Sequence, residues 1–267
     1  MIILQRPGSV EQQSALLERD PTELSDELEL ALRLGQVEIR FQPQFAGDSG
    51  HMVGAEALAR WKHPRFGEIG ARDLFDLAAR AGLADNLPGH ILSLAVAEAR
   101  NWPEGFRLSV NVAPKQLLAE GFVARFPGEV ASSQLDPKQV TLEITEELLL
   151  GDLDLAARQL KQLRDLGFRI ALDDFGAGFC NFDYLKRLPL DALKLDRSMV
   201  QGIVECERDL AVLRAIVTLA RVLGLDVVAE GIETEEQRLA VVAEGCSSWQ
   251  GFLGSEPLAR EDLLQIA

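Results

Sequence analysis

The stretch FRIALDDFGAGFC, residues 168–180, joins an apolar run to two adjacent carboxylates and a Gly-x-Gly turn. The apolar run predicts a strand over residues 168–174. Asp173 and Asp174 then lie at the carboxyl end of that strand, where two negative charges repel unless a cation is close. Either the two acids point apart into water, or something positive is bound beside them.

Similar runs recur on both sides of this stretch, and helical patterns separate most of them. Strands are expected at 37–43, 52–61, 106–112, 139–145, 191–196, 225–231 and around 249–253. About eight strands, most followed by a helix, indicate an α/β fold of the (β/α)8 TIM-barrel type. A doubly wound open sheet is the alternative fold.

The N-terminal part differs from this body. Residues 1–23 are expected to form an extension or linker, and residues 24–267 a single domain. A helix is expected over residues 22–35, with Thr22 or Ser25 as its cap and Gly35 as its stop.

Composition narrows the possible partners and surroundings. The 267 residues carry a formal net charge of −15, which disfavours binding to a nucleic-acid polymer. Cys180, Cys206 and Cys246 are widely spaced and form no C-x-x-C motif, which suits small packing residues in a reducing compartment. No apolar run approaches the ~20 residues of a membrane span, so we expect a soluble, cytoplasmic chain without membrane insertion.

Polar residues gather at the carboxyl ends of the expected strands: Glu56, Arg60, Asn111, Glu143, Asp173, Asp174, Lys194, Asp196 and Glu230. Each one alone is typical of a solvated loop residue, a helix cap or a salt-bridge partner. In a barrel, however, these ends surround one mouth, where the active sites of such folds lie. Five of these carboxylates and an amide, without His or Cys, suit Mg²⁺ or Mn²⁺, and adjacent aspartates suit two ions about 4 Å apart. GAGFCN, residues 176–181, matches a dinucleotide-binding G-x-G-x-x-G motif only in part.

Several motifs together make a family resemblance. The chain contains FQP (41–43), EALARW (56–61), SVN (109–111), LEITE (142–146), LDDFGAGF (172–179), LPLDALKLDRS (189–198), VAEGIET (228–234) and QGFLGSEPL (250–258). In this order they resemble the EAL domain family, bacterial phosphodiesterases that open cyclic di-GMP. The match covers roughly residues 24–267. It implies a modified (β/α)8 barrel with one antiparallel strand.

The resemblance also implies roles for individual residues. The implied metal shell is Glu56, Asn111, Glu143, Asp173, Asp174 and Glu230. Glu230 is implied as general base, and Lys194 lies where the family places a lysine beside the attacking water and the scissile phosphate. Glu56 is included among the catalytic residues. Positions around the phosphates and guanines are Gln42, Leu58, Arg60, Asp196, Glu233 and Gln250, and Glu146 matches the glutamate that anchors the loop after Asp174.

The implied reaction is hydrolysis of cyclic di-GMP to linear pGpG with two Mg²⁺ or Mn²⁺ ions per site, Ca²⁺ being inhibitory. One rival is a non-catalytic cyclic di-GMP sensor, although the chain keeps the family's metal ligands and lysine. Another is an unrelated metal-dependent barrel enzyme such as a glycerophosphodiesterase, which would need His ligands that the strand ends lack.

The resemblance further implies a homodimer formed near the loop after Asp174. Cys180 and Asn181 depart from the small hydroxylated residues usual in that loop. Residues 1–23 resemble the linker that joins a GGDEF domain to an EAL domain, which makes the chain a possible cytoplasmic part of a larger protein.

Overall fold

The computed structural model describes residues 20–146, 152–177 and 182–267. Residues 1–19 of the expected extension therefore lie outside the described residues. Cys180 and Asn181 lie outside them as well. The strands of the described chain are β1 Val37–Ala46, β2 Met52–His63, β3 Gly67–Ile69, β4 Arg107–Asn111, β5 Val140–Thr145, β6 Arg169–Phe175, β7 Ala192–Leu195, β8 Asp226–Ala229 and β9 Ser248–Gln250.

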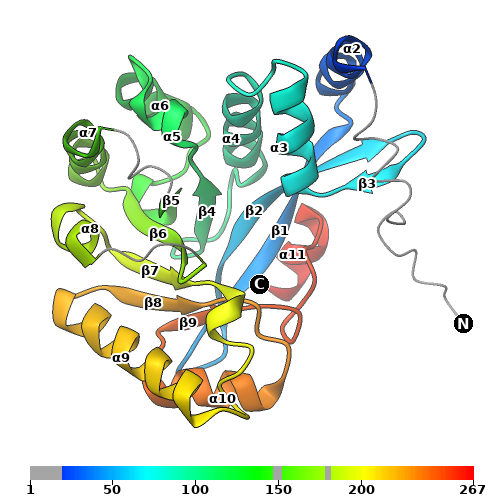
Figure 1. The fold of residues 1–267 in the computed structure, drawn as a ribbon. Coiled ribbons are helices and arrows are strands. Elements are labelled where there is room, and N and C mark those ends of the chain that lie inside the picture. Colours follow the sequence, from blue (N-terminus) through cyan, green and yellow to red (C-terminus); the bar gives the residue numbers. More distant parts are fainter. Residues whose placement is uncertain (1–19, 147–151, 178–181) are drawn as a thin grey trace, which may run out of the picture.

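These strands close into a barrel with one antiparallel member (Figure 1). Strand β2 pairs in parallel with β4, and β4 to β9 continue this parallel pairing in chain order. The short strand β3 pairs with β2 in antiparallel orientation and lies outside the barrel. β1 runs antiparallel to both of its neighbours and closes the ring through Gln44, Phe45 and Ala46 against β9. The predicted modified (β/α)8 barrel is confirmed, and the doubly wound open sheet is wrong.

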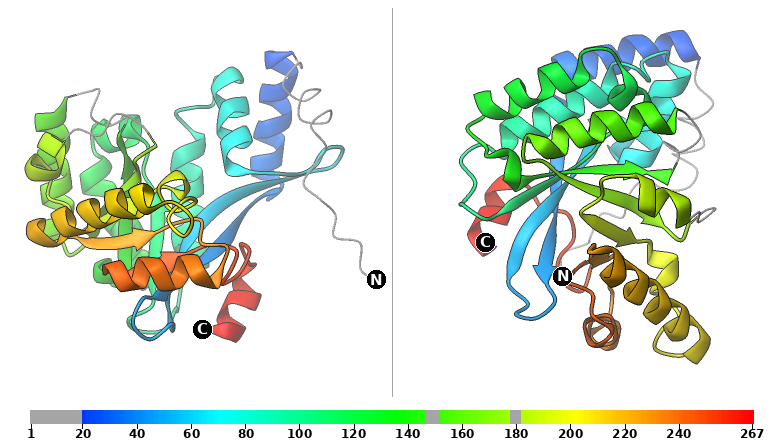
Figure 2. Two further views of the ribbon diagram at one scale, coloured as in Figure 1. Left: turned by 60° about the horizontal axis from the view of Figure 1, so that its bottom comes forward. Right: turned by 90° about the vertical axis from the view of Figure 1, so that its left-hand side faces the viewer.

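Helices surround the strands on the outside of the barrel (Figure 2). They are α2 Pro21–Arg33, α3 Ala71–Arg80, α4 Leu87–Glu98, α5 Pro114–Leu118, α6 Phe122–Ser132, α7 Leu153–Asp165, α8 Phe182–Arg187, α9 Glu207–Leu223, α10 Glu235–Glu244 and α11 Arg260–Ile266, with short 3₁₀ helices η1 Pro137–Gln139 and η3 Arg197–Met199.

The apolar stripes of α7 and α9 face the barrel. On α7, Ala156, Leu160 and Leu163 are fully buried, and on α9 Leu213 and Ala220 are buried in the same way. They join one continuous core with the outward side chains of the strands. Residues three and four apart share one helix face, so the helices bury their apolar stripes against the sheet.

The first described helix packs on one side of the barrel. Leu24 and Leu28 of α2 are fully buried in a cluster with Trp61 of β2 and Leu74 of α3. Its N-cap is Asp20, whose carboxylate accepts the Thr22 N–H at 2.9 Å. The expected caps Thr22 and Ser25 are therefore wrong, because an acceptor one position before the helix satisfies its first free N–H groups.

Candidate active site

The carboxyl end of β6 is irregular where the two aspartates follow one another. Pairing with β7 shifts register between Leu172 and Phe175. Asp174 takes a left-handed backbone conformation, with φ 55°. This bulge leaves Asp173 buried and Asp174 exposed. Both carboxylates still reach the same place, because one oxygen of each lies within 4.8 Å of the other and of a Glu230 oxygen. The two acids therefore do not point apart into water.

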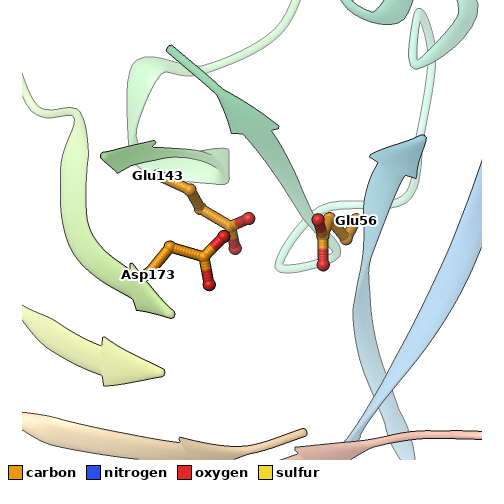
Figure 3. A group of neighbouring side chains, drawn as sticks. All are labelled: Glu56, Glu143 and Asp173. Carbon is orange, nitrogen blue, oxygen red and sulfur yellow. The ribbon is translucent and has the colours of Figure 1, made fainter. Parts of the chain in front are cut away.

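Two more strands bring carboxylates to the same centre. Glu143 of β5 and Asp173 of β6 lie side by side and face Glu56 of β2 (Figure 3), and one oxygen of each lies within 4.8 Å of the others. Parallel register explains this convergence, since Asn111 pairs with Glu143 and Thr145 with Asp173 at equivalent heights in the barrel.

A buried lysine lies among these acids. The Nζ atom of Lys194 is 2.7 Å from Glu143 Oε2, 2.8 Å from Glu230 Oε1, 2.9 Å from Asp173 Oδ1 and 3.2 Å from Glu56 Oε2. Its side chain is 1% exposed. One ammonium therefore faces four carboxylates, and an ammonium has only three hydrogens to donate.

Amides complete the inner layer. Gln250 Nε2 donates to Glu56 Oε2 at 2.7 Å and to Glu230 Oε1 at 3.1 Å. Asn111 Nδ2 donates to Glu56 Oε1 at 3.0 Å. Gln44 on β1, which the sequence analysis missed, donates to Gln250 Oε1 at 2.9 Å and fixes that amide. The Gln-x-Gln spacing of FQPQ was the available signal, since residues two apart share one face of a strand.

Electrostatics reflect the excess of negative charge. Burial raises the pKa of Glu230 to about 8. The positive charge of Lys194 opposes this shift, whereas the negative charges of Asp173 and Glu56 add to it. Burial and the neighbouring acids also raise the pKa of Glu143 well above its ordinary range and raise that of Asp173. Burial acts against ionisation of Glu56 too, but Lys194, Gln250 and Asn111 keep its pKa below the ordinary value. The site holds more carboxylates than its own cation can balance.

This donor set fits divalent metal ions. Glu143 Oε1 is buried and accepts no hydrogen bond from the described residues. Burying such groups uncompensated costs several kcal/mol per ion. The ligands are oxygens, which Mg²⁺ and Mn²⁺ prefer. A cation at this centre would supply the missing charge and the missing partners.

Two cavities open beside the carboxylates. One, of about 280 Å³, is lined by Gln42, Glu56, Leu58, Arg197, Glu230, Gly231, Glu233, Gln250, Gly251 and Phe252. The other, of about 470 Å³, lies over α3 and α4 and includes Leu58, Arg72, Phe75, Pro114, Asn111 and Asp174 in its lining. Leu58 belongs to both, so the cavities adjoin at the metal-ligand candidates.

Not every predicted site residue lies in these cavities. The guanidinium of Arg60 has its Nε 3.6 Å from Glu68 Oε1 on β3, and Asp196 caps η3 by accepting the Ser198 N–H at 2.9 Å. Substrate contacts by these two residues stay predictions. Glu146 directly follows β5, but part of the loop that it is expected to anchor lies outside the described residues. Arg197, Arg72 and Phe252 line the cavities and were not singled out from the sequence.

Comparison with known proteins identifies the family. The EAL domain model matches residues 25–257. This chain belongs to the EAL domain family. The EAL domain is 36% identical over 250 residues to the Pseudomonas aeruginosa protein MucR, a bifunctional diguanylate cyclase/cyclic di-GMP phosphodiesterase, covering 92% of this chain and 36% of MucR. It is 33% identical to the cyclic di-GMP phosphodiesterase RocR of the same organism, covering 98% of this chain and 71% of RocR.

Solved structures agree with the fold. The PaMucR phosphodiesterase in its c-di-GMP complex superposes with a TM-score of 0.84 at 36% identity, covering 90% of this chain and 99% of that one. The calcium and cyclic di-GMP complex of Klebsiella pneumoniae BlrP1 gives 0.76 at 29% identity, covering 84% and 56%.

Two further observations concern the length of this chain relative to its relatives and its helices. The chain spans about a third of the length of the first curated relatives that it matches. In the described ranges, no helix combines the length and apolar character required to cross a bilayer.

Proposed function

We propose that this EAL domain hydrolyses cyclic di-GMP to linear pGpG with the help of divalent metal ions. The observation that carries the proposal is that metal-ligand candidates line both of two cavities that share Leu58, with Glu56 and Glu230 in one and Asn111 and Asp174 in the other. Cyclic di-GMP has two guanosine halves joined by two phosphodiesters. Such a ligand fits a two-lobed site with one phosphate at the junction and one base in each lobe.

The chain's own residues account for metal binding. Glu56, Asn111, Glu143, Asp173, Asp174 and Glu230 would hold the ions. Bound divalent cations would neutralise charge on the phosphate and make water a better nucleophile at neutral pH. The four carboxylates around Lys194 and the carboxylate of Asp174 otherwise face a single ammonium and a dianionic ligand. The BlrP1 complex, which contains calcium and cyclic di-GMP, supports binding of a divalent metal by this fold.

Side chains at the centre have distinct roles in the proposed reaction. Glu230 takes the proton from the attacking water. The water oxygen bonds to phosphorus as the P–O3′ bond breaks, and the departing 3′ oxygen takes up a proton to become the 3′-hydroxyl of pGpG. Lys194 balances the charge that gathers on the phosphate oxygens, while Gln250 holds Glu56 and Glu230 in place.

The relatives support hydrolysis over mere sensing. MucR, RocR and a third Pseudomonas aeruginosa relative, NbdA, are named as cyclic di-GMP phosphodiesterases. Within the proposal, residues 24–267 form the catalytic unit, residues 1–23 form a linker, and the chain works in the cytoplasm as a homodimer.

Incubation of the purified chain with Mg²⁺ and cyclic di-GMP tests the proposal, with pGpG followed by chromatography. We expect one pGpG for each cyclic di-GMP consumed. Tight binding of cyclic di-GMP to folded, metal-loaded protein without any product would instead favour the sensor.

A further inference from the structure

The smaller cavity contains an ion pair that the catalytic scheme does not use. Arg197, at the start of η3, has its Nη2 atom 2.8 Å from Glu233 Oε1. Arg197 follows Lys194 by three residues, and Glu233 follows Glu230 by three. Among the described residues that line this cavity, Arg197 is the one cation.

Contacts with Gly231 and Gln201 hold the Arg197 side chain in place. The arginine stem lies on Gly231, where a Cβ atom would come within 2.5 Å of Arg197 Cγ. Gly231 also has φ 66°, which favours glycine. Gln201, with its amide oxygen turned toward the guanidinium, accepts from Arg197 Nε at 2.8 Å. The guanidinium of Arg197 is therefore held with its Nη2 atom facing Glu233.

Glu233 is fixed as well. Its backbone N–H donates to Gln237 Oε1 at 2.9 Å, within the capping box that begins α10. Behind it, the backbone of Ile232 packs on Gly251, where a Cβ atom would lie 2.2 Å from the Ile232 oxygen. Both side chains are partly exposed, Arg197 to 50% and Glu233 to 41%. The ion pair thus links two loop segments whose backbones are held in place by these contacts.

We propose that Arg197 is a positioning residue for base recognition, which rests on the proposed function. It binds one oxygen of the Glu233 carboxylate and keeps that group aimed into the cavity. The other oxygen remains to accept hydrogen bonds. Guanine presents two adjacent donors on its pairing edge, N1–H and the 2-amino group. Adenine presents an acceptor at N1, which a carboxylate repels because an ionised carboxylate only accepts hydrogen bonds.

Discrimination follows from this arrangement. A site built to accept from a base rejects an analogue that lacks the donors, because buried polar groups are then left unpaired. Without Arg197, the carboxylate of Glu233 would lose the partner that orients it and would turn toward water. Guanine recognition would weaken, while the chemistry at the carboxylate centre would be unaffected.

The experiment compares wild type, Arg197→Ala, Arg197→Lys, Glu233→Gln and the double variant Arg197→Ala/Glu233→Gln. Arg214→Ala is the matched control, because Arg214 forms a similar ion pair with Glu244 at 2.7 Å on α9 and α10 and does not line the cavity. Hydrolysis of cyclic di-GMP gives kcat and KM, and titration gives Kd for cyclic di-GMP and for cyclic di-AMP.

We expect Arg197→Ala to raise KM and Kd for cyclic di-GMP about tenfold with kcat within about twofold, which is the signature of lost uniform binding. Cyclic di-AMP affinity should stay the same, Arg197→Lys should restore part of the loss, and the double variant should be no weaker than Glu233→Gln alone. Arg214→Ala should match wild type.

An equal loss of affinity for both dinucleotides would overturn the proposal, since it would assign Arg197 to the shared phosphates. So would unchanged affinities, or a fall in kcat alone. If wild type binds cyclic di-GMP without cleaving it, the Kd comparison still decides the role of Arg197 although the proposed hydrolysis fails. If wild type binds no cyclic di-GMP, both proposals are wrong.

Discussion

Lys194 Nζ lies 2.7 Å from Glu143 Oε2, and both side chains are 1% exposed. Neither group meets water, so each depends on the other for its charge. Lys194 serves three further carboxylates in the same way. The lysine is therefore both a structural cation and, in the proposed reaction, a group at the scissile phosphate.

Replacing this lysine should affect activity and metal-free stability. Lys194→Ala leaves buried acids without their cation, a change that typically costs roughly 3–5 kcal/mol. We expect a lower melting temperature in chelator, recovery of much of that loss with Mg²⁺, and turnover reduced by at least about 100-fold, since each tenfold is about 1.4 kcal/mol of transition-state stabilisation. Thermal unfolding with and without metal, together with product formation, measures both effects.

The control for this variant is Lys62→Ala, which removes a half-exposed ion pair with Glu38 on β1 and β2. Exposed pairs contribute about 0–1 kcal/mol, so it should change neither quantity appreciably. Near wild-type turnover in Lys194→Ala would show that the lysine takes no part in the reaction.

Period-two alternation accounts for how much of this site could be predicted. It put Glu143 and Lys194 on one side of their strands, and strand closure then brought them together. Alternation could not predict the bulge at Asp174, because a register shift arises from pairing with β7. Nor could it predict the surroundings of Arg60. A three-residue strand, β3, was missed, and it brings Glu68 beside that arginine.

The fold was more predictable than the cavities. Long apolar runs separated by amphipathic helices leave few ways to bury both faces, so the barrel followed from pattern and family motifs. The lining of the smaller cavity depends on where loops after β7, β8 and β9 turn. Arg197 and Phe252 lie in such loops, where Gly231 leaves room for the Arg197 side chain and Gly251 for the backbone of Ile232.

Removal of the proposed base should separate binding from chemistry. In Glu230→Gln the amide keeps the size of the side chain but accepts a proton poorly. Turnover should fall at least about 100-fold, while Kd for cyclic di-GMP should change by less than about tenfold. Pre-steady-state product formation and a separate ligand titration measure the two. Turnover close to that of wild type would assign the base role elsewhere.

Metal uptake should depend on pH through the same residue. The pKa of Glu230 is raised from 4.5 to about 8 without metal, mainly by burial. Between these values the folded chain holds a proton that the unfolded chain has lost, so metal-free stability should fall as pH rises toward 8. A metal must displace that proton, so apparent Mg²⁺ affinity should rise over the same range.

Calorimetric titration with Mg²⁺ at several pH values between 6 and 9 measures this linkage. Glu143 and Asp173, whose pKa values are also raised, should contribute to the slope. Glu230→Gln should therefore lose about one released proton per site rather than the whole effect. An affinity that does not change with pH would contradict the linkage.

Oligomeric state tests the expected homodimer. The family resemblance places dimer contacts near the loop after Asp174, which includes residues outside the described ranges. We expect sedimentation velocity to show a dimer in the presence of Mg²⁺ and cyclic di-GMP, with the monomer fraction growing on dilution. A monomer at every concentration tested would contradict this expectation.

Identity of the metal gives the sharpest test of the carboxylate centre. Five acids converge where a dianionic ligand is proposed to dock, so chelator should abolish hydrolysis and Mg²⁺ or Mn²⁺ should restore it. Mg²⁺ binds oxygen at about 2.0–2.1 Å in near-octahedral geometry, whereas Ca²⁺ takes bonds of about 2.3–2.6 Å with looser geometry. Ca²⁺ should neutralise the acids and admit cyclic di-GMP, yet position the reacting groups poorly.

Each ion should therefore be tested by ligand titration and product formation on the same sample. We expect Ca²⁺ to give cyclic di-GMP affinity within about tenfold of that with Mg²⁺ and turnover lower by at least about 100-fold. Glu143→Gln provides a matched variant, because it removes one buried charge whose Oε1 atom accepts no hydrogen bond from the described residues. It should weaken Mg²⁺ binding without loss of fold. Efficient cleavage in Ca²⁺, or full activity in chelator, would rule out the metal-dependent mechanism.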